Sequence, residues 1–190
     1  MGKPVLFINA CVRKKSRTKR LADKLLQRLG LPWEEVKLSE VSFSVSDEFF
    51  LERRDALIAG GKLEDPLFDL ARQYSEAEII VIAAPYWDLS FPAALKQYFE
   101  QVNVVGLTFR YSEEGVPVGL CKAKTLYYVM TSGGDYAPEE FGFGYVKALA
   151  QNFHGIHDVR LIAATGLDIL GRNAEDILKA ACAKIEDMQV

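Results

Sequence analysis

The segment 79–99 constrains the fold of this chain more than any other part of the sequence. It opens with an unbroken apolar run, Ile79–Ala84, which ends at Pro85. A run of this kind, stopped by a turn residue, indicates a strand that is covered on both faces, as in a parallel sheet. Pro92 then favours the first turn of a helix, where its missing N–H costs nothing. Apolar residues follow at helical spacing, at Leu95, Phe99 and Val102.

The turn between this strand and this helix carries Tyr86, Trp87, Asp88 and Ser90. It would lie at the carboxyl edge of a parallel sheet, which is where open α/β folds bind ligands. Aromatic and polar side chains at such an edge suit a flat ligand with polar edges. The alternative is a well-packed connection between strand and helix with no ligand.

Similar apolar runs predict four more strands along the chain. They are Val5–Ala10, Glu34–Leu38, Lys124–Thr131 and Val159–Thr165. Amphipathic patterns lie between the runs, and the last one has Asn173 as a helix N-cap. Alternating strands and helices predict an α/β fold of βαβ units with right-handed crossovers. Five strands in this pattern favour a doubly wound, flavodoxin-like sheet in the order 2-1-3-4-5, with helices on both faces.

Two stretches are too long for this minimal pattern. Residues 44–77 predict two helices that are separated at Gly60-Gly61, and residues 106–121 predict a hairpin. The two histidines, His154 and His157, are predicted to lie on the surface. Phe49 and Phe50 predict either the apolar face of an insertion helix or a cover for a ligand pocket.

Composition restricts the class of protein. A chain of 190 residues is predicted to form one domain over residues 1–190. The net charge of −3 argues against nucleic acid as a partner, and no apolar stretch reaches the ~20 residues of a membrane span. Three widely spaced cysteines, without a signal-peptide pattern, predict a cytoplasmic protein with no disulfide framework and no metal site.

The loop after the first strand concentrates positive charge between Cys11 and Thr18. A helix begins near Ser16 or Thr18, and helix N-termini attract anions. These two hydroxyls, together with Arg13 or Arg17, predict a phosphate site. A helix cap with exposed basic residues is the alternative.

The same loop also resembles the Cys-x5-Arg-Thr phosphate loop of the low-molecular-weight protein tyrosine phosphatases. The matching residues are Cys11, Arg17 and Thr18. The resemblance implies a hydrolase with Cys11 as its nucleophile. The loop lacks the Gly-Asn of that family, and Asp65-Pro66 lies in the wrong crossover for its general acid.

A third loop, Thr131–Tyr136, follows the fourth predicted strand and contains Gly133 and Gly134. Paired glycines let the backbone approach a ligand closely, and their N–H groups can donate to a ring carbonyl. Taken together, the three loops offer an anion site, an aromatic shelf and a wall of N–H groups. These are the features that flavin mononucleotide (FMN) requires.

Over nearly its whole length the chain resembles the flavodoxin-like NAD(P)H quinone reductases and FMN-dependent azoreductases. Cys11–Thr18 corresponds to that family's Ser-x-Arg-x-x-Ser-x-Ser loop, with cysteine in place of the first serine. Ala84–Leu89 and the helix after Pro92 correspond to its Ala-Pro-Met-Tyr-Asn-Phe turn and Pro-x-x-Leu-Lys-x-Tyr-Phe helix. Gly106–Tyr111 matches its Gly-x-Thr-Phe-x-Tyr segment, and Thr131–Gly134 its Thr-Ser-Arg-Gly-Gly turn, shortened by one residue.

The resemblance implies a homodimeric enzyme that binds FMN and passes hydride from NADH or NADPH to a small-molecule electron acceptor, quinone-like or azo. It implies no catalytic side chain, because the flavin carries the chemistry. The implied cofactor-binding residues are Cys11, Arg13, Ser16, Thr18, Pro85, Tyr86, Trp87, Asp88, Leu89, Thr131, Ser132, Gly133 and Gly134. Asp88 stands where azoreductases have Asn, and it could bond to the flavin or cap the turn. An electron-carrier flavodoxin and a purely regulatory flavin-fold protein remain as alternatives.

Overall fold

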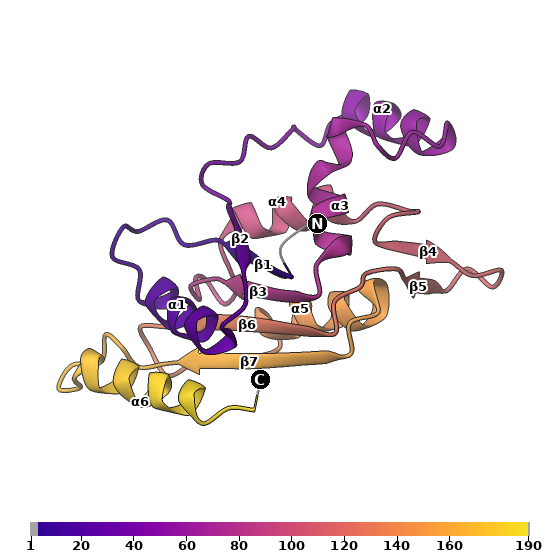
Figure 1. Ribbon diagram of the computed structural model, residues 1–190. Helices are drawn as coiled ribbons and strands as arrows, with labels where there is room; N and C mark the ends of the chain where they lie inside the picture. Colours follow the sequence, from indigo (N-terminus) through magenta and orange to yellow (C-terminus); the bar gives the residue numbers. More distant parts are fainter. Residues whose placement is uncertain (1–3, 190) are drawn as a thin grey trace.

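A computed structural model describes residues 4–189 and shows a parallel sheet between two layers of helices (Figure 1). The sheet contains β1 (Val5–Asn9), β2 (Trp33–Lys37), β3 (Ile79–Ala83), β6 (Thr125–Thr131) and β7 (Asp158–Ala164). Its order is β2-β1-β3-β6-β7, and all neighbouring strands are parallel. When only the strands of this sheet are counted, the order is the predicted 2-1-3-4-5. The predicted fold class is confirmed.

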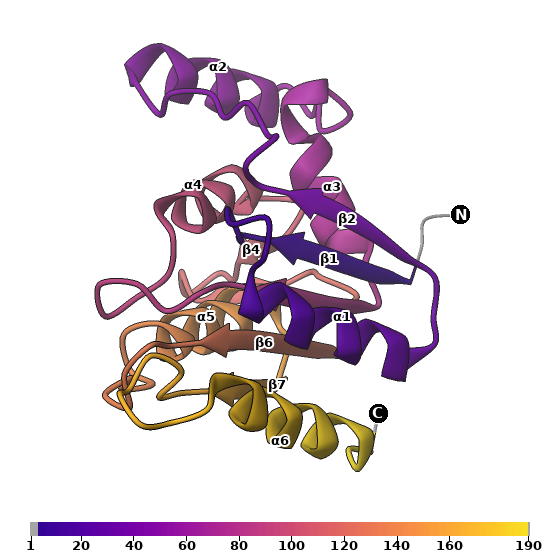
Figure 2. The same cartoon turned by 90° about the vertical axis from the view of Figure 1, so that its left-hand side faces the viewer.

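Helices cover both faces of the sheet (Figure 2). On one face, α1 (Arg17–Leu29) and α6 (Ala174–Glu186) lie side by side. The other face carries α3 (Asp69–Glu76), α4 (Ala93–Val102) and α5 (Phe143–Leu149), which continues into a π-helical turn, Ala150–His154. Each face has its own buried apolar cluster. The central strands β1, β3 and β6 are buried almost throughout, which explains their unbroken apolar sequences.

Local signals in the sequence define the helix ends. Ser16 caps α1, and Gly30 ends it in the left-handed conformation with φ +63°. Asn173 caps α6 as predicted, by accepting from the N–H groups of Glu175 and Asp176. Pro92 is the N-cap of α4 and therefore lies one position before the first turn in which it was expected.

The long segment after β2 forms two helices, as predicted. The first is α2 (Glu48–Ala59), and Gly60-Gly61 separates it from a short 3-10 helix (Pro66–Phe68) that leads into α3. Figures 1 and 2 show α2 projecting from the body of the molecule. Phe50 is buried whereas Phe49 is 73% exposed, so the two do not form one apolar face. Adjacent residues on a helix point in directions about 100° apart, which explains the difference.

The predicted hairpin is also present, as β4 (Phe109–Tyr111) paired with β5 (Pro117–Gly119). Gly119 packs directly against the backbone of His154 and Gly155. This contact brings the hairpin against the end of the π-helical turn.

The prediction of a surface position is wrong for His154, which is fully buried, whereas His157 is exposed. Nε2 of His154 lies 2.8 Å from Asn103 Oδ1, an oxygen that can only accept, so Nε2 carries the proton. Nδ1 then accepts from the Tyr74 hydroxyl at 2.9 Å. Burial lowers the pKa of His154 from 6.5 to about 4.

This buried histidine predicts a pH-dependent stability. Below pH 6.5 the unfolded chain binds the proton more readily than the folded one, so the free energy of unfolding falls until pH ~4. The pKa difference corresponds to about 3 kcal/mol. His154→Gln, which can donate to Asn103 and accept from Tyr74, should remove this component in urea unfolding between pH 4 and 7. His157→Gln is the control and should keep the full pH dependence; an equal slope in all three proteins would contradict the assignment.

Candidate active site

Loops at the carboxyl edge of the sheet enclose a pocket of about 420 Å³. It lies where the crossovers lead to opposite faces of the sheet, the usual binding position in such folds. Most of the predicted site residues line it, namely Arg13, Ser16, Thr18, Pro85, Tyr86, Trp87, Thr131, Ser132 and Gly133. Four others do not line it, namely Cys11, Asp88, Leu89 and Gly134. Arg17, which was predicted as an alternative to Arg13 beside the phosphate, also lines the pocket, together with Val12, Lys15, Leu167 and Asp168.

The first wall of the pocket is the start of α1. Ser16 Oγ accepts from the N–H of Lys19 at 3.2 Å, so its side chain both caps the helix and faces the pocket. The N–H groups of Arg17 and Thr18, ahead of Lys19 in the first helical turn, have no acceptor within the helix and are available to an anion. Thr18 Oγ1 lies 2.6 Å from Thr131 Oγ1, which fastens the helix to the end of β6.

Asn9, the last residue of β1, holds the loop that leads to α1. Asn9 Oδ1 accepts from the N–H of Cys11 at 2.9 Å, and Asn9 Nδ2 donates to Glu35 Oε1 at 2.7 Å. This pair of hydrogen bonds turns the chain away from β1 towards the basic residues. Asn9 is 1% exposed, so the arrangement is buried beneath the loop.

Cys11 points inward and does not line the pocket. Its side chain is buried in the core, and its Sγ lies 3.7 Å from the carbonyl oxygen of Ala83. Burial raises the pKa of the Cys11 thiol. A cysteine phosphatase needs an accessible thiolate with a lowered pKa, so this geometry contradicts the phosphatase alternative.

The second wall is the turn after β3. Trp87 and Ser90 exchange backbone hydrogen bonds of 3.0 and 2.7 Å, and both central residues, Asp88 and Leu89, have positive φ (50° and 66°). These are the features of a type I′ turn. The turn exposes Asp88 and Leu89 at its tip and leaves Trp87 in the pocket wall. Asp88 is a residue that such turns favour, but Leu89 stands where glycine is usual, so the sequence did not predict the turn.

The third and fourth walls are loops joined by backbone hydrogen bonds. The N–H groups of Gly166, Leu167 and Asp168 donate to the carbonyl oxygens of Gly134, Ser132 and Gly133, at 3.0, 3.2 and 2.9 Å. Sequence reasoning missed the fourth loop although a signal was present. It follows the predicted strand Val159–Thr165 and therefore had to emerge at the same edge of the sheet.

Charge in the pocket is mainly positive. Arg13, Lys15 and Arg17 line it, with Asp168 as the carboxylate opposite. Arg17 Nη1 lies 2.6 Å from Asp168 Oδ1 and within 3.5 Å of the carbonyl oxygen of Leu167. Cations beside a helix N-terminus and two hydroxyls form a site for an anion such as a phosphate ester.

Residues 3–188 match a family model described as a flavodoxin-like fold. The chain belongs to this family. It is 35% identical to the FMN-dependent NADH:quinone oxidoreductase of Clostridium beijerinckii, over 96% of each chain. The enzyme of the same name from Coprothermobacter proteolyticus is 33% identical, over 97% of this chain and 96% of the relative.

Solved structures show the same flavodoxin-like fold. An azoreductase from Bacillus anthracis str. Sterne aligns with a TM-score of 0.83 at 23% identity, covering 96% of both chains. An FMN-dependent NADH-azoreductase from Bacillus anthracis str. Ames Ancestor, solved in complex with FMN, aligns with a TM-score of 0.81 at 24% identity. That alignment covers 98% of this chain and 97% of the other.

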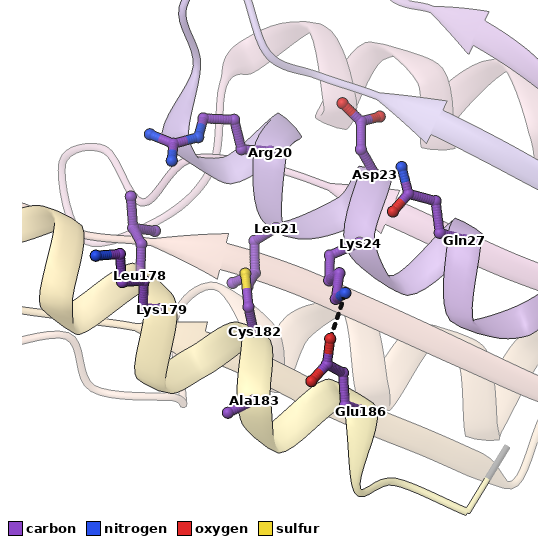
Figure 3. Close-up of a pocket in the computed structure, with 10 residues that line it drawn as sticks. All are labelled: Arg20, Leu21, Asp23, Lys24, Gln27, Leu178, Lys179, Cys182, Ala183 and Glu186. Carbon is purple, nitrogen blue, oxygen red and sulfur yellow. Dashed lines mark ion pairs between the residues drawn. The ribbon is translucent and has the colours of Figure 1, made fainter.

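This flavodoxin-like chain has a second hollow of about 460 Å³ between α1 and α6 (Figure 3). An ion pair between Lys24 and Glu186 bridges the two helices there (Figure 3), and Arg20 pairs with Glu175 of α6. The hollow has neither a glycine loop nor a hydroxyl group, and it lies on the helical layer away from the ends of the strands. We therefore place the candidate site in the pocket at the sheet edge.

Residues 4–189 contain neither a helix that could span a membrane nor a group of side chains that could hold a metal ion. No helix there is both long and apolar enough to cross a membrane. Within the same residues, no three His, Cys, Asp or Glu side chains are grouped as a metal site would require.

Proposed function

We propose that this chain is an FMN-dependent oxidoreductase that uses NADH or NADPH to reduce a quinone-like or azo acceptor. The observation that carries the proposal is the pocket at the sheet edge, which combines a basic helix N-terminus, an aromatic turn and a glycine loop. The relatives named FMN-dependent NADH:quinone oxidoreductase support the same function, since each is aligned over nearly the whole chain.

The residues present fit FMN. The N–H groups and hydroxyls at Ser16 and Thr18, with Arg13 and Arg17 nearby, suit its phosphate. Trp87 offers an aromatic surface to the ring system, and the backbone at Gly133 offers close approach to its polar edge. When bound, FMN supplies the two-electron redox chemistry that links nicotinamide to the acceptor.

The side chains of the pocket bind and orient rather than react. The thiol of Cys11 is buried, and the hydroxyls of Thr18 and Thr131 share a hydrogen bond in which Thr18 can accept while it donates its own proton to a phosphate. Backbone hydrogen bonds join the loops Ser132–Gly134 and Gly166–Asp168 and hold this wall of the pocket in place. Because FMN would supply the chemistry, the protein needs neither a nucleophile nor a general base of its own.

The visible spectrum of the purified protein is the decisive experiment. Flavin absorption bands, together with steady NADH or NADPH oxidation in the presence of menadione, are expected. An electron-carrier flavodoxin would show the bands but little turnover without a partner reductase. A protein that shows no flavin bands and gains none after incubation with FMN would refute the proposal.

We further infer that the protein is a cytoplasmic homodimer whose active sites lie at the subunit interface. Large apolar side chains are exposed on the loops around the pocket, including Val12, Leu89, Tyr136 and Phe141. A second subunit would remove this apolar surface from water. The three cysteines are free, as is usual in a reducing compartment. Sedimentation should give twice the mass of the 21.2 kDa chain. A fully active monomer at assay concentration would contradict the dimer.

A further inference from the structure

Asp168 is the one carboxylate among the lining residues of a pocket that suits an anion. Its side chain is 68% exposed and pairs with Arg17, whose side chain is 40% exposed. Its backbone position is determined independently of that pair, because the N–H of Asp168 donates to the carbonyl oxygen of Gly133 at 2.9 Å. The Asp168 carboxylate lies close against Gly133, since a Cβ there would be 2.6 Å from Asp168 Oδ2. The fold thus places a negative charge in the wall of an anion site.

We propose that Asp168 is a specificity-determining residue that weakens the binding of phosphate-bearing ligands by competing for Arg17. The proposal rests on the function inferred above, in which the phosphate of FMN occupies this pocket. Two effects act in the same direction. The carboxylate repels a dianion, and it engages the guanidinium that would otherwise contact the phosphate.

The ion pair can be displaced easily. Exposed pairs of this kind contribute little stability, because water screens them and both side chains lose freedom. A phosphate dianion must break the Arg17–Asp168 pair before it can bind Arg17, and this costs a small amount of binding free energy. A ligand without a phosphate leaves the pair intact and does not incur this cost. Asp168 consequently tunes affinity according to the charge of the ligand rather than its ring.

The test compares three flavins that differ in the charge of the 5′ group. FMN is a dianion, riboflavin 5′-sulfate a monoanion, and riboflavin neutral. Dissociation constants are measured by flavin fluorescence with the wild-type protein and Asp168→Asn. We expect Asp168→Asn to bind FMN about tenfold more tightly and the sulfate about threefold more tightly, because Coulomb energy is proportional to charge. Riboflavin affinity should not change.

A neighbouring carboxylate offers a matched control. Asp135 forms an ion pair with Arg172 at 2.8 Å but does not line the pocket. Asp135→Asn should leave all three dissociation constants unchanged, whereas Asp168→Ser should reproduce the effect of Asp168→Asn.

Two results would overturn the proposal. If Asp168→Asn weakens FMN binding, Asp168 positions Arg17 for the phosphate instead of competing for it. If it shifts all three flavins by the same factor, its effect is on the pocket in general. In both cases the wild-type protein still binds FMN, so the proposed function stands; a wild-type protein that binds none of the three flavins would refute both.

Discussion

Replacing Ser16 and Thr18 together by alanine should weaken FMN binding by about 10²- to 10⁴-fold. Both hydroxyls line the anion pocket at the start of α1. Losing two hydrogen bonds to a charged phosphate costs about 3–6 kcal/mol. Riboflavin, which has no phosphate, should bind with nearly unchanged affinity. Fluorescence titration of both flavins measures the ratio directly.

Ser16 also caps α1, so its replacement destabilises the helix by about 1 kcal/mol. Asn173→Ala is the control for this effect, because it removes the equivalent cap of α6 at a residue that does not line the pocket. It should lower the free energy of unfolding by a similar amount without changing FMN affinity. An equal loss of FMN and riboflavin affinity in the double variant would place the phosphate elsewhere.

Gly119→Ala should destabilise the protein by about 3–5 kcal/mol, among the largest effects of a single methyl group. A Cβ at this position would overlap the backbone of His154 and Gly155, which cannot rotate away as a side chain can. Relieving the overlap would separate the hairpin from the π-helical turn and disturb the hydrogen bonds of His154. Urea unfolding at neutral pH measures the change.

The same hairpin provides a comparison at Gly115. Its φ is +78°, and nothing lies within 4 Å of a Cβ built there. Gly115→Ala should therefore show only the backbone strain of a left-handed residue, about 1–2 kcal/mol. Equal losses for the two variants would mean that the contact at Gly119 is not tight in solution.

The sheet could be predicted because its signals are local. The run Ile79–Ala84 is apolar since β3 is covered on both faces, and Asn173 stands immediately before α6. The carboxyl-edge rule then brought three loops together in advance, and residues from all three line the pocket. The family predicted from the motifs is confirmed by the flavodoxin-like family model and by the similarity to FMN-dependent NADH:quinone oxidoreductases.

What escaped prediction depends on contacts between distant residues. The burial of His154 requires Tyr74 and Asn103, which lie 80 and 51 residues away in the chain. Cys11 could be placed in the loop from its sequence, but its inward orientation involves a contact with Ala83 at the end of the neighbouring strand β3. Asp168 belongs to a fourth loop whose position is set by backbone bonds to residues 132–134, and such bonds leave no pattern in the side chains.

The turn at Asp88-Leu89 contains a residue, Leu89, that is unfavourable for the stability of the turn itself. Two successive left-handed residues are accommodated best by Asn-Gly, the pair that a designer would write to close such a hairpin. Leucine in this conformation is strained by about 1–2 kcal/mol, yet here it presents an aliphatic side chain that is 45% exposed. Leu89→Gly should therefore relieve the backbone strain and at the same time remove the exposed leucine side chain. The chain thus keeps a strained turn that exposes an aliphatic side chain two residues after Trp87, which lines the pocket.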